Sequence, residues 1–343
     1  RNALDGQKIG DEESYNVNTS LEYRTGGKFL AILSAGFGTD DDGLAGITLQ
    51  DRFANNCFLN VARQYYCGEV REQSSSTLNR AGLADREGVY RDTVRVSAQL
   101  EWDFDSFRIV SNSGAFFTDA EYGYDSTYQG ATAIAPTTVP GAPGFTRAAT
   151  DPVRTGAVMR NEVTERDEWS TELRIQSSQE GGLRWLGGAF YYQSERSLEE
   201  RHFLATAPTL FSGETRVDNW AVFGSLGVDL TDRWDVTAEL RYAEDTIGNF
   251  NIVRTPPLSE QQFDSWSPRL TSKFSITSDS MVYVSAALGN KPGVINADPR
   301  FPPELRFAEE EEAWSYELGT KNVLFDDRLS ANAAVYFIDW SKQ

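Results

Sequence analysis

Histidine and cysteine are nearly absent from this chain, and that scarcity excludes several kinds of chemistry. Among 343 residues there is 1 His, His202, and there are 2 Cys. Ser/His/Asp and Cys/His nucleophile systems need a histidine beside the nucleophile, and histidine-rich metal sites need several. We therefore expect neither an enzyme nor a cofactor-binding protein, and we interpret His202 as a solvated loop residue.

Long apolar runs and an excess of positive charge are also absent. No stretch approaches the ~18 apolar residues of a transmembrane helix. The net charge is -19 and the isoelectric point is near 4.5, which would repel phosphate backbones, so we expect no nucleic-acid partner. The mean hydropathy of -0.46 resembles that of a soluble protein. It does not exclude a membrane β-barrel, because half of every barrel strand is polar.

The segment from Trp234 to Tyr242 shows what the chain does contain. Apolar and polar residues alternate strictly there, as in a β-strand with two different faces. One face would carry Trp234, Val236, Ala238, Leu240 and Tyr242, and the other Asp235, Thr237, Glu239 and Arg241. If the apolar face meets lipid, a slip of one residue would bring charges into hydrocarbon, where each Arg or Lys costs roughly 2 to 4 kcal/mol. The same alternation recurs at 15–23, 94–102 and 169–176.

Short and long connections alternate along the chain. Tight turns join pairs of predicted strands at Thr25–Gly27, Asp103–Asp105, Gln179–Gly182, Thr231–Arg233, Thr277–Asp279 and Phe325–Asp327. Long polar segments separate these pairs, at Asp40–Arg91, Gly123–Arg166, Glu199–Glu214, Glu244–Gln262 and Gly289–Glu312. The pattern is typical of an all-β, antiparallel, up-and-down transmembrane β-barrel. We predict about twelve strands and a single domain, residues 1–343.

The two cysteines, Cys57 and Cys67, lie in the first long segment. Two isolated cysteines so close together in a polar loop indicate a disulfide in an oxidising compartment, and two unrelated thiols are the alternative.

Acidic runs occur in two of the long segments, Asp40, Asp41 and Asp42 in one and Glu309, Glu310, Glu311 and Glu312 in the other. Such carboxylates are weak candidates for collecting Ca²⁺ or Mg²⁺, through which a loop would bridge lipopolysaccharide phosphates. The alternative is a hydrated loop without a metal.

Several motifs resemble the barrel of TonB-dependent outer-membrane receptors. They include Trp266–Leu270, Tyr316–Lys321, Leu324–Leu329 and Ala333–Trp340, in this order, and the agreeing stretches earlier in the chain begin at Glu172. The resemblance spans nearly the whole chain. Where the family usually reads Gly-Phe-Arg-Pro-Gly, this chain reads Gly289-Asn290-Lys291-Pro292-Gly293, without the aromatic residue and the guanidinium.

The resemblance implies a plugged barrel of about 22 strands, of which this chain would be the middle part, without the plug. It further implies active uptake of a scarce ligand such as a ferric siderophore across the bacterial outer membrane, energised by the TonB complex through the plug region. Membrane lipid and lipopolysaccharide would surround the barrel. Two other functions stay open: a passive porin, and a structural or adhesive barrel that binds a partner protein through its long loops.

Charged residues on the polar faces are the candidates for lining the lumen. They would form hydrogen bonds with one another and with a plug more often than with a ligand. The candidates are Arg95, Glu101, Glu172, Arg174, Glu239, Arg241, Arg269, Lys273, Glu317 and Lys321.

Overall fold

The structure is a computed structural model that describes residues 1–3, 5–44, 87–125, 133–134, 154–155, 158–178, 181–204, 207–250, 260–295, 302, 306–326 and 328–342. All regular elements in these ranges are β-strands. Within them, no helix is long and apolar enough to cross a bilayer.

Twelve long strands form the main sheet: β1 (Glu12–Thr25), β2 (Phe29–Asp42), β3 (Gly88–Asp103), β4 (Phe107–Asp125), β7 (Val158–Ser177), β8 (Leu183–Leu204), β9 (Ala207–Thr231), β10 (Trp234–Phe250), β11 (Glu260–Ser275), β12 (Ser280–Lys291), β15 (Glu311–Leu324) and β16 (Leu329–Ser341). Two further pairs of short strands lie outside it, β5 (Ala133–Ile134) with β6 (Arg154–Thr155), and β13 (Val294–Ile295) with β14 (Phe307–Ala308).

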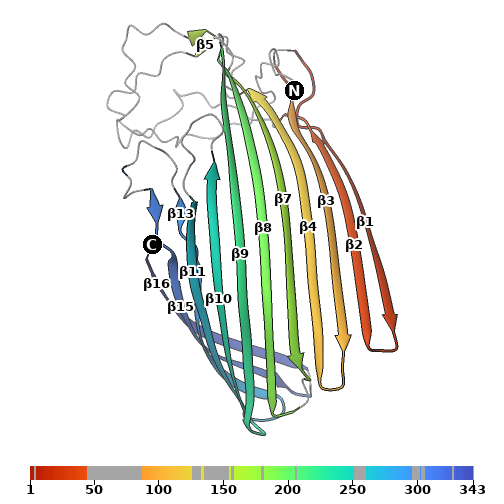
Figure 1. The fold of residues 1–343 in the computed structure, drawn as a ribbon, viewed down its shortest axis with the longest axis vertical. Coiled ribbons are helices and arrows are strands. Elements are labelled where there is room, and N and C mark those ends of the chain that lie inside the picture. The colour runs from red at the N-terminus through yellow and green to blue at the C-terminus, as the bar shows by residue number, and fades with distance from the viewer. Residues whose placement is uncertain are drawn as a thin grey trace.

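Each long strand pairs antiparallel with its neighbours in chain order, from β1 at one edge to β16 at the other. The sheet curves strongly, so that β15 and β16 pass behind β10 and β11 in Figure 1. The short turns gather at the lower rim, and the strand ends that the long connections join lie at the upper rim. The predicted all-β, up-and-down architecture is confirmed.

Every one of the predicted tight turns falls between two paired strands, because Gly or Asp in each turn permits the reversal. At the first turn, Gly26 and Gly27 have φ angles of 54° and 69°, which a residue with a Cβ adopts only at a cost. At the last turn, Phe325 and Asp326 adopt similar angles without glycine.

The strand ends differ from the prediction at the upper rim. The segment 199–214, expected to be a loop, is almost entirely strand, since β8 runs to Leu204 and β9 begins at Ala207. These two strands have 22 and 25 residues. A barrel strand needs only about 9–11 residues to cross the hydrocarbon, so this hairpin extends well beyond it.

The sheet is a single layer and has almost no core. Among the described residues the buried apolar side chains are Leu44, Val110, Ala221, Ala243 and Ile295. The ladder of backbone hydrogen bonds and the alternation of side chains therefore define the structure, as in membrane barrels, where lipid and the barrel contents cover the two faces.

Candidate functional site

The charged candidates share one face of the sheet, which we call the inner face. The pairing places Glu239 opposite Arg269, and Glu172 opposite Phe190. Following the register from strand to strand puts all ten on the side opposite Trp234, Leu240 and Leu270.

An ionic cluster lies on this face near the short turns. Asp235 on β10 pairs with Arg184 on β8, and it also lies 3.6 Å from the Nζ of Lys273 on β11. Arg184 donates from Nη1 to Asp229 at 2.9 Å. The Asp235 side chain is only 15% exposed, so its two cations replace much of its hydration. The cluster thus joins four neighbouring strands, β8 to β11.

Further ion pairs occupy the wall above and beside this cluster. Arg269 lies 3.2 Å from Glu239, Arg174 lies 3.1 Å from Glu172, and Arg108 lies 3.6 Å from Glu101. Most candidates are therefore neutralised by a neighbour on the same face, which lowers the cost of facing a partly dry interior.

Aromatic rings accompany two of the other cations. The Nζ of Lys321 lies 5.9 Å from the ring centre of Tyr283, whose hydroxyl donates to Glu317. The guanidinium of Arg241 lies 5.4 Å from the ring centre of Phe190 and 5.9 Å from that of Phe223. Such distances are those of cation–π contacts.

Sequence reasoning missed four residues that build this face: Arg184, Phe190, Phe223 and Tyr283. Around Phe190 the segment 186–192 mixes glycine with aromatic residues on both faces, so alternation alone could not assign a phase. Strand pairing supplies it, because Gly188 lies opposite Phe223 and Phe190 opposite Ala221.

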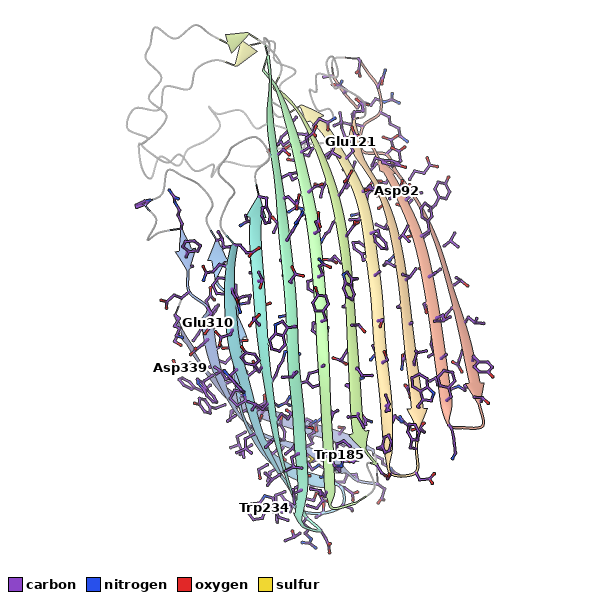
Figure 2. The ribbon with its side chains drawn as sticks, viewed as in Figure 1. Asp92, Glu121, Trp185, Trp234, Glu310 and Asp339 are labelled. Carbon is purple, nitrogen blue, oxygen red and sulfur yellow. The ribbon has the colours of Figure 1, made fainter. Side chains whose placement is uncertain are left out.

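The opposite face carries two rows of aromatic side chains. The upper row, on the side of the long connections, crosses β7 to β11, with ring centres 4.8 Å apart for Trp169 and Tyr191, 5.5 Å for Trp220 and Tyr242, and 4.9 Å for Tyr242 and Trp266. Near the short turns, Figure 2 shows Trp185 and Trp234. Two aromatic rows bounding an apolar band are typical of the two membrane interfaces.

The acidic runs are partly neutralised. Asp40 accepts from Arg91 Nε at 2.8 Å, Glu311 lies 2.9 Å from Lys291, and Glu312 lies 2.7 Å from Lys342. In the described ranges no three His, Cys, Asp or Glu side chains are grouped as a metal site requires. The candidates Asp41, Asp42, Glu309 and Glu310 therefore gain no support as metal ligands.

Glu310 lies in the connection that precedes β15. Burial raises the pKa of its carboxyl group, Lys342 opposes the shift, and the carboxylates of Glu312, Asp264 and Glu309 add to it. Its Oε2 atom is buried without a hydrogen-bond partner in the described part of the chain.

Two sequence predictions fall on three residues of which little or nothing is described. Cys57 and Cys67 lie outside the described residues. His202 lies in β8, opposite Arg160, and is thus not the loop residue we expected.

A curved antiparallel sheet with short turns at one rim, an ion-paired inner face and an apolar outer face bounded by aromatic rows defines a transmembrane β-barrel protein. The family model described as "TonB dependent receptor-like, beta-barrel" matches residues 12–342. The chain belongs to this family of bacterial outer-membrane receptors, which are not enzymes.

Solved structures confirm the fold. The ferric yersiniabactin uptake receptor FyuA from Yersinia pestis superimposes with a TM-score of 0.67 at 15% identity, over 98% of this chain and 46% of that one. The siderophore receptor PiuA from Acinetobacter baumannii superimposes with a TM-score of 0.64 at 15% identity, over 96% of this chain and 50% of that one. The ferric-catecholate import receptor Fiu from E. coli K12 superimposes with a TM-score of 0.67 at 12% identity, over 98% of this chain and 52% of that one.

Among curated proteins, the pesticin receptor of Yersinia pestis is 27% identical over 150 residues, which are 42% of this chain and 22% of the relative. The chain thus spans about half the length of the solved structures, and its alignment with this relative covers about a fifth of it.

Proposed function

We propose that this chain is part of the barrel of an outer-membrane receptor that takes up a scarce small-molecule ligand, such as a ferric siderophore, with energy supplied through TonB. Family membership over residues 12–342 is the observation that carries the proposal. The ligand class is supported by FyuA, a ferric yersiniabactin uptake receptor, by Fiu, a ferric-catecholate import receptor, and by PiuA, a siderophore receptor.

We propose that the inner face lines the lumen and contacts a plug. Residues 1–343 would then form one continuous part of a larger barrel, because the solved structures of this fold are about twice as long. The ion pairs of Asp235, Glu239 and Glu172 would hold the wall together, and their remaining hydrogen-bonding capacity would meet the plug.

The inner aromatic residues favour this function over a passive porin. A water-filled pore gains nothing from Phe190 and Phe223 on its wall, whereas a filled lumen buries them. An adhesive barrel would bind through its loops and would leave the character of the inner wall unexplained.

The outer face and the cysteines complete the proposal. The apolar band of the sheet would contact membrane lipid, and lipopolysaccharide would lie above the upper aromatic row. A disulfide between Cys57 and Cys67 stays a prediction, which the mass of the peptide before and after reduction tests.

Uptake by whole cells tests the function. Cells producing the protein would be given radioactive iron bound to a catecholate, a hydroxamate or a carboxylate siderophore, with TonB present or deleted. We expect one class to accumulate several-fold above cells without the protein, only when TonB is present. Accumulation that does not depend on TonB would support the porin instead, and no accumulation of any class would exclude the siderophore.

A further inference from the structure

Arg241 stands apart from its neighbours on the inner wall. Arg174, Arg184 and Arg269 each pair with a carboxylate. For the Arg241 guanidinium, the described residues provide neither an ion pair nor a hydrogen-bond acceptor; it has only the two phenyl rings of Phe190 and Phe223.

The acids closest in sequence are already engaged. Glu239, two residues before Arg241 on β10, pairs with Arg269 at 3.2 Å. Asp245, four residues after it, accepts from Asn219 Nδ2 at 2.7 Å. Neither acid therefore forms an ion pair with Arg241, whose N–H donors keep their hydrogen-bonding capacity.

The two rings hold the guanidinium but leave its edge unpaired. A cation–π contact covers a face of the planar group, whereas the N–H donors point outward in the plane. Arg241 also borders a hollow of about 410 Å³, together with Glu172, Glu239, Phe223 and Arg269. A guanidinium with aromatic rings beside it, no ion pair among the described residues and a hollow at its border suits a planar oxyanion, which accepts two parallel hydrogen bonds.

Gly188 makes this arrangement possible. It lies opposite Phe223 on the neighbouring strand, and a Cβ at this position would come within 2.5 Å of the Phe223 ring. The absence of a side chain at 188 therefore allows the ring to lie where it meets Arg241. We call this arrangement of Phe190 and Gly188 on β8, Phe223 on β9 and Arg241 on β10 the cradle.

We propose that Arg241, held by Phe190 and Phe223, receives a carboxylate inside the barrel. The inference rests on the proposed function only in that the inner face lines a lumen. The carboxylate comes either from a free ligand or from a side chain of a protein segment that fills the lumen.

Labelling with phenylglyoxal tests the site and distinguishes these sources. The reagent reacts at the nitrogen edge of a guanidinium, which the rings leave open and a carboxylate blocks. Purified protein in detergent would be labelled with and without citrate, and the modification of Arg241 followed by peptide mass spectrometry. Arg174, which is paired with Glu172, is the reference for a protected guanidinium. Arg95 is the reference for a reactive one, because no ion pair is found for it among the described residues.

Rapid labelling of Arg241 that citrate slows several-fold would support a free carboxylate ligand. Protection equal to that of Arg174 without citrate would support a carboxylate from the protein itself. Labelling at the rate of Arg95 with and without citrate would overturn the proposal. Since the labelling assay needs no transport, Arg241 can be protected even if the uptake experiment fails. Equally, uptake can occur even if Arg241 is not protected.

A pair of glycine variants tests the cradle. Gly188→Ala displaces the Phe223 ring and should lower the protection of Arg241 several-fold. Gly187→Ala is the control, because a Cβ there would meet nothing within 4 Å. Equal protection in both variants would show that the ring does not position Arg241.

Discussion

The two faces of β10 are one residue apart along the chain, yet different forces hold their side chains. On the inner face, Asp235 and Glu239 each have a cationic partner on the neighbouring strand β11, Lys273 and Arg269. On the outer face, Leu240 is 47% exposed and Trp234 is 44% exposed, with no polar neighbour that would explain their position except the indole hydrogen bond to Ser272. The inner face is specified by its own contacts, whereas the outer face is specified by the solvent that it meets.

This difference explains why a single-layer sheet can keep one register. The outer side chains gain free energy only if that face meets lipid, and the inner pairs form only if the same register is kept. A slip of one residue would therefore cost free energy on both faces at once, because it would place charges in lipid and would also break the ion pairs of the inner face.

The largest effect should come from placing a charge on the outer face. Ala238→Arg lies between Trp234 and Tyr242 on that face, near the middle of the apolar band, and should lower the free energy of unfolding by roughly 2–4 kcal/mol. The control is Thr237→Arg on the inner face of the same strand, which should change it by less than about 0.5 kcal/mol. Denaturant unfolding of the protein in lipid vesicles measures both, and equal losses would contradict the assignment of the faces.

An intermediate effect should come from opening the ionic cluster. Asp235→Asn leaves Arg184 and Lys273 without the carboxylate that they share. We expect a loss of about 1–2 kcal/mol, since both partners keep some contact with solvent. Asp105→Asn is the control, because Asp105 is fully exposed and 3.9 Å from Lys28, and no change should be measurable. If the two variants unfold alike, the cluster contributes nothing.

The smallest effect concerns Glu310, whose raised pKa makes its contribution depend on pH. A carboxyl group with a raised pKa in the folded protein stabilises below its unfolded value, here 4.5, and loses that contribution as the pH rises through the folded value. Glu310→Gln should therefore raise the melting temperature at pH 7, by about 1 °C, and leave it unchanged at pH 4. Asp105→Asn, at a fully exposed position away from Glu310, is the control. An equal shift at both pH values would show that ionisation is not the cause.

Much of this architecture could be predicted from period-two alternation and turn residues. Trp234–Tyr242 showed its phase directly, because every second residue was charged or polar. Alternation is informative only where the two faces meet different surroundings. At Leu186–Tyr192 alternation did not show which residues face inward, because apolar residues occupy both faces and Phe190 faces inward. The cradle of Arg241 could therefore not be found from the sequence.

The same reason explains the error at 199–214. Above the upper aromatic row, both faces of β8 and β9 carry polar residues, such as Glu195 and Arg196, and such a stretch looks like a loop. Backbone pairing continues there because each strand already has its partner from below, and pairing adds hydrogen bonds without requiring an apolar face.

That tall hairpin has a consequence for how the protein can change over generations. Where water lies on both faces, a new side chain meets no lipid and displaces no core, so neither register nor stability restrains the choice of residue. Glu195 and Arg216 pair across this hairpin at 3.5 Å with about half of each side chain exposed, and either is replaceable at little cost. This hairpin is then free to vary its surface while its backbone stays fixed.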